Sequence, residues 1–319
     1  MNENRGLLGG GWNRLANNKR YIVWFYVLNL ALAAFGAGTF YIQAHDFLDH
    51  SLLSGRLVHG FDVGPLMEML SQPEFGSVHG AFGPSLHFVL LFLALTALFM
   101  PGVLLGYASN YRLPREDFFR ACGRNLWRFI RLMIIAGIVM GAVAGALFGI
   151  RTALMKAAAE STNELLPFYT SMASLAVIFL VMSVLRIWFD LAQADAVLSD
   201  QRAVRKSIAV AFRHTWRSLG RLLGSYVATT IVAAIILVAG LWAWMNFVPS
   251  TSVAGATFVS QLLLLLLLIP RFWQRGVAVT YYLQNMVEPI PVQSFAPPAP
   301  PTNAPITLPM SSPPEAQTS

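Results

Sequence analysis

The sequence is built from long apolar stretches that are separated by shorter polar segments. Six stretches are long enough, or nearly so, to cross a bilayer, whose hydrocarbon core takes about 20 helical residues. They run from Tyr21 to Gln43, Ser85 to Tyr107, Leu132 to Ile150, Pro167 to Leu185, Leu222 to Phe247 and Val253 to Ile269. Each must satisfy its own backbone hydrogen bonds in lipid, so the predicted fold class is all-α, a polytopic membrane helix bundle.

The last stretch is the shortest, and it can cross the membrane if its helix continues through Arg271. Pro270 is expected to bend or break that helix. The first stretch is longer than the core of a cleavable signal peptide, which holds about 7 to 15 apolar residues. We therefore expect it to be retained as a span.

Composition supports a membrane protein. Hydrophobic residues make up 56% of the chain and charged residues only 12%, against about 25% charged in a globular average. The single cysteine, Cys122, excludes an internal disulfide framework and offers no zinc cluster.

The position of the basic residues predicts the orientation. The net charge is +7, but of the 22 lysines and arginines only Arg56, Arg151 and Lys156 fall in the loops of one side. Lysine and arginine are favoured in cytoplasmic loops, which places both termini in the cytoplasm. The charge thus records topology and does not indicate nucleic acid as a partner.

The predicted domains are a basic N-terminus (1–20), a six-span membrane domain (21–285) and a proline-rich tail (286–319) that should be disordered and partly polyproline.

A motif repeats along the chain. Arg124-Asn-Leu-Trp127-Arg128 precedes the third span, and Arg213-His-Thr-Trp216-Arg217 precedes the fifth. A second repeated motif, Arg-x-Trp, follows the fourth span at Arg186 and the sixth span at Arg271. We interpret these repeated motifs as a duplicated hairpin with a basic amphipathic helix at its start, which gives units at 21–107, 114–198 and 200–285; the alternative is that Trp and Arg are simply common at membrane interfaces.

Two further sets of residues lie at helical spacing. Basic faces that recur every four residues could bind anionic lipid or an acidic partner, or could only fix topology; they comprise Arg120, Arg124 and Arg128, and Arg213, Arg217 and Arg221. A ridge of small residues in the third span could pack within the monomer, form a homo-oligomer or line a conduction path; it comprises Gly137, Gly141, Gly145 and Gly149.

Ionisable groups near the spans are few. Arg186 and Asp190 lie one helical turn apart at the inner rim, as do Arg271 and Arg275. The spacing predicts a local Arg186–Asp190 pair, with a pair between Asp190 and either of the other two arginines as the alternative. Because no Asp, Glu or Lys lies mid-span, the pattern argues against an ion-coupled transporter.

The outer loop between the first two spans carries most of the histidines. His45, His50, His59, His79 and His87 fall in or next to it. They follow no recognised metal spacing, so no metal and no cofactor is predicted, and the faces of short interfacial helices are the preferred interpretation. Motifs for nucleophilic or phosphate chemistry are missing from the sequence.

The stretch from Arg186 to Val227 carries a resemblance. Asp190-Leu-Ala-Gln-Ala-Asp-Ala-Val-Leu198, an Ala/Ser-rich helix from Val204 to Phe212, and Trp216-Arg-Ser-Leu-Gly220 follow one another. The pattern resembles bacterial multi-pass membrane proteins and is similar to the membrane domain attached to some glycerophosphodiester phosphodiesterases. The resemblance implies a bacterial inner membrane setting. It carries no enzymatic role, because the catalytic domain with its metal-binding carboxylates is not in this chain.

The preferred function is a non-enzymatic scaffold or accessory protein that contacts membrane lipid, in particular anionic lipid, or a membrane partner. A transporter or channel for a small solute, built on the repeated hairpins, is the alternative. A membrane enzyme that uses the outer histidines is a third.

Overall fold

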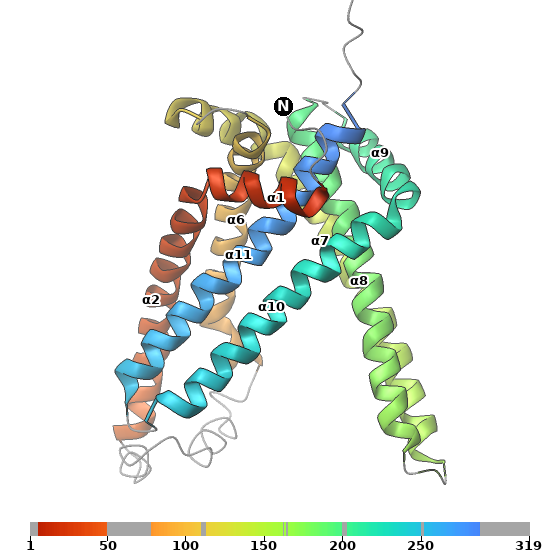
Figure 1. The fold of residues 1–319 in the computed structure, drawn as a ribbon. Helices are drawn as coiled ribbons and strands as arrows, with labels where there is room; N and C mark the ends of the chain where they lie inside the picture. The colour runs from red at the N-terminus through yellow and green to blue at the C-terminus, as the bar shows by residue number, and fades with distance from the viewer. Residues whose placement is uncertain are drawn as a thin grey trace, which may run out of the picture. The chain divides into compact units, whose positions relative to one another are not determined.

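A computed structural model describes residues 6–49, 78–109, 113–161, 163, 165–199, 203–249 and 252–287, and this part of the chain is all-α (Figure 1). In chain order the helices are α1 (Leu7–Asn17), α2 (Arg20–Asp49), α6 (Val78–Ala108), α7 (Arg115–Ala159), α8 (Leu166–Leu198), α9 (Val204–Arg217), α10 (Leu219–Phe247) and α11 (Val253–Asn285). The proline-rich tail from residue 288 onward lies outside the described residues.

Five helices, α6, α7, α8, α10 and α11, are long and apolar enough to cross a membrane. The chain is therefore a multi-pass membrane protein, as its sequence predicts. The first predicted span coincides with α2, a helix of 30 residues; its apolar part within the described side chains, Arg20–Gly36, is shorter than the other five. A total of six crossings stays a prediction.

One expectation about helix breaks is wrong, and a second, the bend or break at Pro270, is wrong as to the break. The sequence predicted a separate basic helix before the third span, but α7 is one helix of 45 residues that begins after Pro114 and carries Glu116 and Asp117 in its first turn. No proline interrupts it, so the basic segment and the span form one element. In addition, α11 is not broken at Pro270 and runs on to Asn285, which confirms the predicted continuation through Arg271.

Before the fifth span the predicted separate helix is present. α9 ends at Arg217 and α10 begins at Leu219, with Ser218 between them at φ −122° and ψ 27°. The same backbone conformation ends α1, where Asn18 has φ −122° and ψ 30°. In both places a short helix turns into a long apolar one.

The packed core lies where α1, α9 and the first turns of α7 meet the last turns of α8 and α11, which we call the basic end. Buried side chains gather there in two clusters, one around Tyr21, Tyr107 and Phe118 and one around Ile187 and Tyr281. Farther along the same helices, large apolar side chains are exposed. They include Phe148, Phe168, Trp242 and Met245, which suits contact with lipid.

Away from the basic end the helices pack mainly in pairs. α7 packs on α8, α10 on α11, and α2 on α6, and the ribbon shows α7 and α8 diverging from the other long helices (Figure 1). The helices are thus joined most extensively at the basic end.

α1 crosses α11 at very close range, a contact that was not predicted from the sequence. A Cβ atom added to Gly11 would lie 2.8 Å from the backbone nitrogen of Val277, and one added to Gly276 would lie 2.6 Å from the carbonyl oxygen of Gly11. Only glycine allows two backbones to approach this closely. Arg14 secures the crossing by donating hydrogen bonds to the Tyr107 carbonyl and to Thr280 Oγ1.

Gly11→Ala should therefore weaken the docking of α1. The added methyl would meet backbone atoms, and overpacking of this kind destabilises by about 1–3 kcal/mol. Gly9→Ala is the matched control, since a Cβ at Gly9 has nothing within 4 Å and alanine is the better helix former by about 0.5–1 kcal/mol. Thermal unfolding in detergent and tryptic cleavage at Arg14 measure the difference; equal effects of the two changes would contradict the close crossing.

Candidate functional site

The last three turns of α8 form the most deeply buried helical segment of the basic end. All eleven positions from 187 to 197 except Trp188 are buried. Small side chains at Ala192, Ala194 and Ala196 allow α6, α9, α10 and α11 to pack against this segment. The same segment carries the polar residues Asp190, Gln193 and Asp195, so polar groups are held inside the helix contacts.

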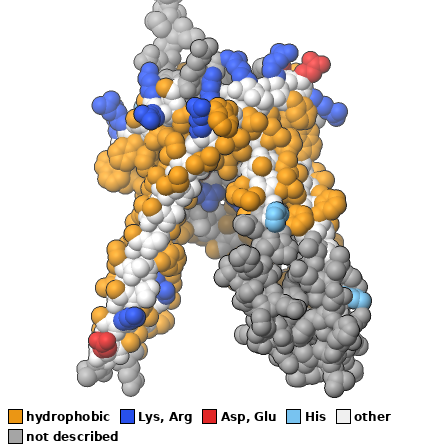
Figure 2. Space-filling view, turned by 180° about the vertical axis from the view of Figure 1, so that it is seen from behind, with side chains coloured by type: hydrophobic (Ala, Val, Ile, Leu, Met, Phe, Trp, Pro, Cys, Tyr) orange, Lys and Arg blue, Asp and Glu red, His pale blue; other side chains and the backbone are white. Residues whose placement is uncertain are grey.

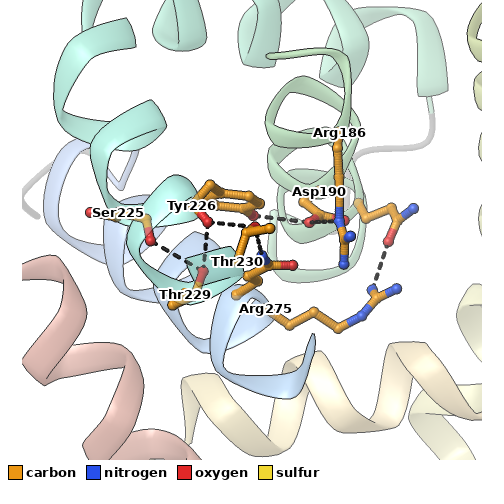
Figure 3. A network of polar contacts seen from close by, with 9 residues as sticks. Arg186, Asp190, Ser225, Tyr226, Thr229, Thr230 and Arg275 are labelled. Carbon is orange, nitrogen blue, oxygen red and sulfur yellow. Dashed lines mark hydrogen bonds and ion pairs between the residues drawn. The ribbon is translucent and has the colours of Figure 1, made fainter. Parts of the chain in front are cut away.

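Asp190 is the centre of a polar cluster. Its Oδ2 atom accepts a hydrogen bond of 2.9 Å from Tyr226 Oη on α10 and lies 3.9 Å from Arg186 Nε (Figure 3). Asp190 and Tyr226 are 7% and 2% exposed. The local Arg186–Asp190 pair has the spacing that the sequence predicts, whereas the phenol of Tyr226 comes from another helix and was not anticipated.

Two more arginines reach the cluster from α11. Arg275 Nη1 donates a hydrogen bond of 3.0 Å to Gln193 Oε1 on α8. Both Arg271 and Arg275 interact electrostatically with Asp190 and Arg186. The structure therefore brings together all four ionisable residues that the sequence places at the inner rim, and three of the four are cations.

Hydroxyl and amide groups join α10 to α11 beside the cluster. Gln274 Nε2 donates to Thr230 Oγ1 at 3.1 Å, and Thr230 Oγ1 donates to the Tyr226 carbonyl at 2.8 Å (Figure 3). These contacts fix the position of α11 relative to Tyr226. α11 is thus held by hydrogen bonds to two neighbouring helices, α8 and α10.

A cavity of about 370 Å³ lies next to the arginines. Its walls come from α2, α6 and α11, and Arg271 and Arg275 both line it. Arg271 is exposed to this space and donates no hydrogen bond to any residue that the structure describes. By contrast, Gln193 holds the guanidinium of Arg275.

The predicted basic faces lie elsewhere, on the surface of the basic end. Arg120, Arg124, Arg213, Arg217 and Arg221 are exposed and Arg128 is half-buried. The tryptophans of the two Arg-x-x-Trp-Arg motifs are exposed to the same degree, Trp127 by 62% and Trp216 by 64%. The space-filling view shows basic side chains spread over this end, and basic surface is also visible inside the hollow between the diverging helices (Figure 2).

The tryptophans of the two Arg-x-Trp motifs, Trp188 and Trp273, make the same kind of contact. Trp188 Nε1 donates to the Ile208 carbonyl of α9, and Trp273 Nε1 donates to the Leu8 carbonyl of α1, both at 2.9 Å. Each indole therefore holds a short helix against the end of a long one. This similarity is consistent with a duplicated unit, which stays a prediction.

The glycine ridge of α7 faces away from the rest of the described chain. A Cβ atom added at Gly137, Gly141, Gly145 or Gly149 would have nothing within 4 Å. Close packing at this ridge within the monomer is therefore not found among the described residues. A role in self-association or conduction stays a prediction.

The outer histidines give no site in the described residues. His45 and His87 are exposed, and His50, His59 and His79 lie outside the described part of the chain. Within that part, no group of three His, Cys, Asp or Glu side chains is placed to hold a metal ion.

The fold and the site together define a multi-pass helical membrane protein with an arginine-rich polar cluster inside its basic end. In comparisons with known protein families, with curated proteins and with solved structures, nothing matches the chain. Its function must therefore be argued from the cluster itself.

Tyr226→Phe should destabilise the protein, because it removes a buried hydrogen bond to a charged acceptor while leaving the ring in place. Such bonds contribute about 1.5–3 kcal/mol. The matched control is Ser225→Ala on the preceding residue, whose hydroxyl bonds only the Arg221 carbonyl of its own helix and contributes little to stability. Thermal unfolding in detergent compares the two, and a loss no larger than that of the control would show that Asp190 does not depend on Tyr226.

Proposed function

We propose that the protein is a non-enzymatic lipid-binding membrane protein of scaffold or accessory type, and that Arg186, Arg271 and Arg275 receive the anionic headgroup of a membrane lipid. The observation that carries the proposal is the excess of charge in the cluster. Arg186 lies 3.9 Å from the carboxylate of Asp190, and Arg271 and Arg275 add two further positive charges near it. The cluster therefore holds two more positive charges than negative ones.

An excess of charge at this depth calls for a further anion. Arg271 lies five residues from the point where α1 crosses α11 at Gly276, about 8 Å along the helix. A cation away from bulk water is costly unless it is paired. Phosphate is a suitable partner, because guanidinium binds its oxygens with two parallel hydrogen bonds.

The surrounding surface favours the same class of ligand. We propose that the basic end faces the cytoplasm of a bacterial cell and that the chain lies in the inner membrane. The exposed arginines of α7, α9 and α10 then lie near anionic headgroups, where each contributes about 1 kcal/mol to attraction. They would concentrate anionic lipid around the buried cluster.

A transporter or channel is the second candidate, and the cavity beside Arg271 is the feature in its favour. The sequence left open a conduction path lined by the glycine ridge of the third span. The cavity instead lies between α2, α6 and α11. The lipid-binding proposal accounts for both the cavity and its arginines.

Arg271→Gln should reduce binding of an anionic lipid without destabilising the protein. Arg271 donates no hydrogen bond to a described residue and lies among two other cations, so its loss relieves repulsion in the lipid-free protein. Its loss should weaken lipid binding by about tenfold or more, since a hydrogen bond to a charged group contributes about 1.5–3 kcal/mol. Native mass spectrometry with phosphatidate in neutral detergent measures the dissociation constant, and thermal unfolding measures stability.

Arg217→Gln on the exposed face of α9 is the control for this experiment. Its effect should be smaller and should vanish at high salt, because dissolved ions screen charges at the surface. The effect of Arg271→Gln should persist. If the two variants respond alike to salt, the arginine cluster beside the cavity has no special role in binding.

The proposed orientation can be tested with single cysteines in a Cys122→Ser background. A cysteine at Ser161, between α7 and α8, should react with a membrane-impermeant maleimide added outside intact inner-membrane spheroplasts. A cysteine at Ser199, at the basic end of α8, should react only after the membrane is opened. Labelling of Ser199→Cys from outside would reverse the proposed topology.

A further inference from the structure

The cavity between α2, α6 and α11 changes in polarity along its length. Arg271 and Arg275 line it at the end nearer α1, and Ser260 lines it eleven residues earlier on α11, about 16 Å away along the helix. The rest of the α11 wall is leucine and phenylalanine, with Leu263, Leu264, Leu267, Leu268 and Phe272. Its volume of about 370 Å³ lies in the range of small-ligand sites, about 300–1,000 Å³.

Two polar side chains mark an intermediate level of the cavity. The ring of Phe25 on α2 contacts that of Phe272, next to Arg271, at 5.1 Å between centroids. Asn29 lies one turn farther along α2 and lines the cavity, so it lies about 6 Å deeper along this helix than Phe25. Thr96 of α6 lines the same cavity.

The hydroxyl of Thr96 is buried and has no hydrogen-bond partner within the described chain. A hydroxyl on a helix can often bond a carbonyl of its own preceding turn, as Thr230 does here. A buried polar group without a partner is unfavourable by about 1–3 kcal/mol. A buried hydroxyl without a protein partner marks a position where a water molecule or a polar atom of a ligand is expected.

We infer that this cavity binds an anionic glycerolipid with one acyl chain inserted along α11. The phosphate lies at Arg271 and Arg275, the glycerol ester or hydroxyl lies at Asn29 and Thr96, and the chain extends past Leu267 toward Ser260. The inference rests on the proposed function, because the headgroup arginines are the same. It adds the ligand class and the place of the hydrocarbon chain.

The order of groups in the cavity favours a lipid over a free phosphate compound. A small hydrophilic phosphate would leave the leucine and phenylalanine walls unfilled. A fatty acid would supply the anion and the chain but no second polar group for Thr96. A glycerolipid supplies an anion, an ester and a chain in the order in which the wall presents arginine, hydroxyl and leucine.

The test uses the purified full chain in neutral detergent and titrates it with palmitoyl lysophosphatidate, with glycerol 3-phosphate as the headgroup without a chain. Leu267→Trp fills the part of the cavity proposed for the acyl chain and should weaken binding of the lipid by about tenfold. Leu266→Trp is the matched control, because Leu266 is the adjacent residue, is 37% exposed and does not line the cavity. It should leave the dissociation constant of the lipid within about twofold.

Thr96→Val is a second variant that keeps the shape of the side chain. It removes the unpartnered hydroxyl, so the lipid-free protein should unfold at a higher temperature while the lipid binds about tenfold more weakly. A purely structural role for Thr96 would not move stability and affinity in opposite directions. An unchanged affinity for the lipid would overturn the contact with the ester.

The outcomes separate the two proposals. If Arg271→Gln weakens binding of the lipid but Leu267→Trp does not, the headgroup site is supported and the proposed pocket for the acyl chain is wrong. If Arg271→Gln has no effect on the lipid, the proposed function fails. If glycerol 3-phosphate binds as tightly as the lipid, the ligand is a free phosphate compound and the inference is overturned.

Discussion

A charged side chain within a membrane must have a partner, and this constraint determines how α8, α10 and α11 meet. Asp190 lies in a helix segment that is buried on almost every side, so its carboxylate could not be tolerated alone. Tyr226 of α10 and Arg186 of its own helix satisfy it. Gln193, one turn further along α8, holds Arg275 of α11. Two polar contacts thus join α8 to α10 and to α11, and the alanines of this segment allow the helices to approach.

The farther parts of the helices follow a different rule. In lipid, apolar side chains gain little by leaving the hydrocarbon, so exposed residues such as Ile138, Ile235 and Met245 give no force that draws helices together. The helices are consequently joined by polar contacts and close backbone crossings, which are concentrated at the basic end. The crossing of Gly11 with Gly276 is the clearest of these. A protein built this way has one well-packed end and, beyond it, helix pairs that expose apolar side chains.

Much of the fold could be predicted from the sequence, because length and apolarity alone define a membrane helix. The crossing of α1 with α11 was not predicted, because glycines along the chain do not show which helix will approach them; here Gly10 and Gly11 make room for α11. The break before the third span, inside α7, was wrongly expected because a charged segment was interpreted as a separate element. The helix has no residue that would interrupt it there.

Interactions within one helix could be predicted, as with Arg186 and Asp190, since helical spacing fixes them. The pairing of Asp190 with Tyr226 depends on how two helices pack, which a pattern along the chain does not encode.

Topology explains most of the arginines but not Arg271. A basic residue that orients a span acts from a loop or a helix end, where water and headgroups solvate it, and the exposed arginines of α7 and α9 suit that role. Arg271 lies farther in, beside two other cations and next to a cavity. For the chain alone this arrangement is unfavourable, because like charges repel and no described residue accepts a hydrogen bond from Arg271. A local conflict of this kind is typical of functional sites, where a ligand supplies what the fold lacks. The missing component here is an anion, and the apolar walls beneath it suit one that enters from the membrane.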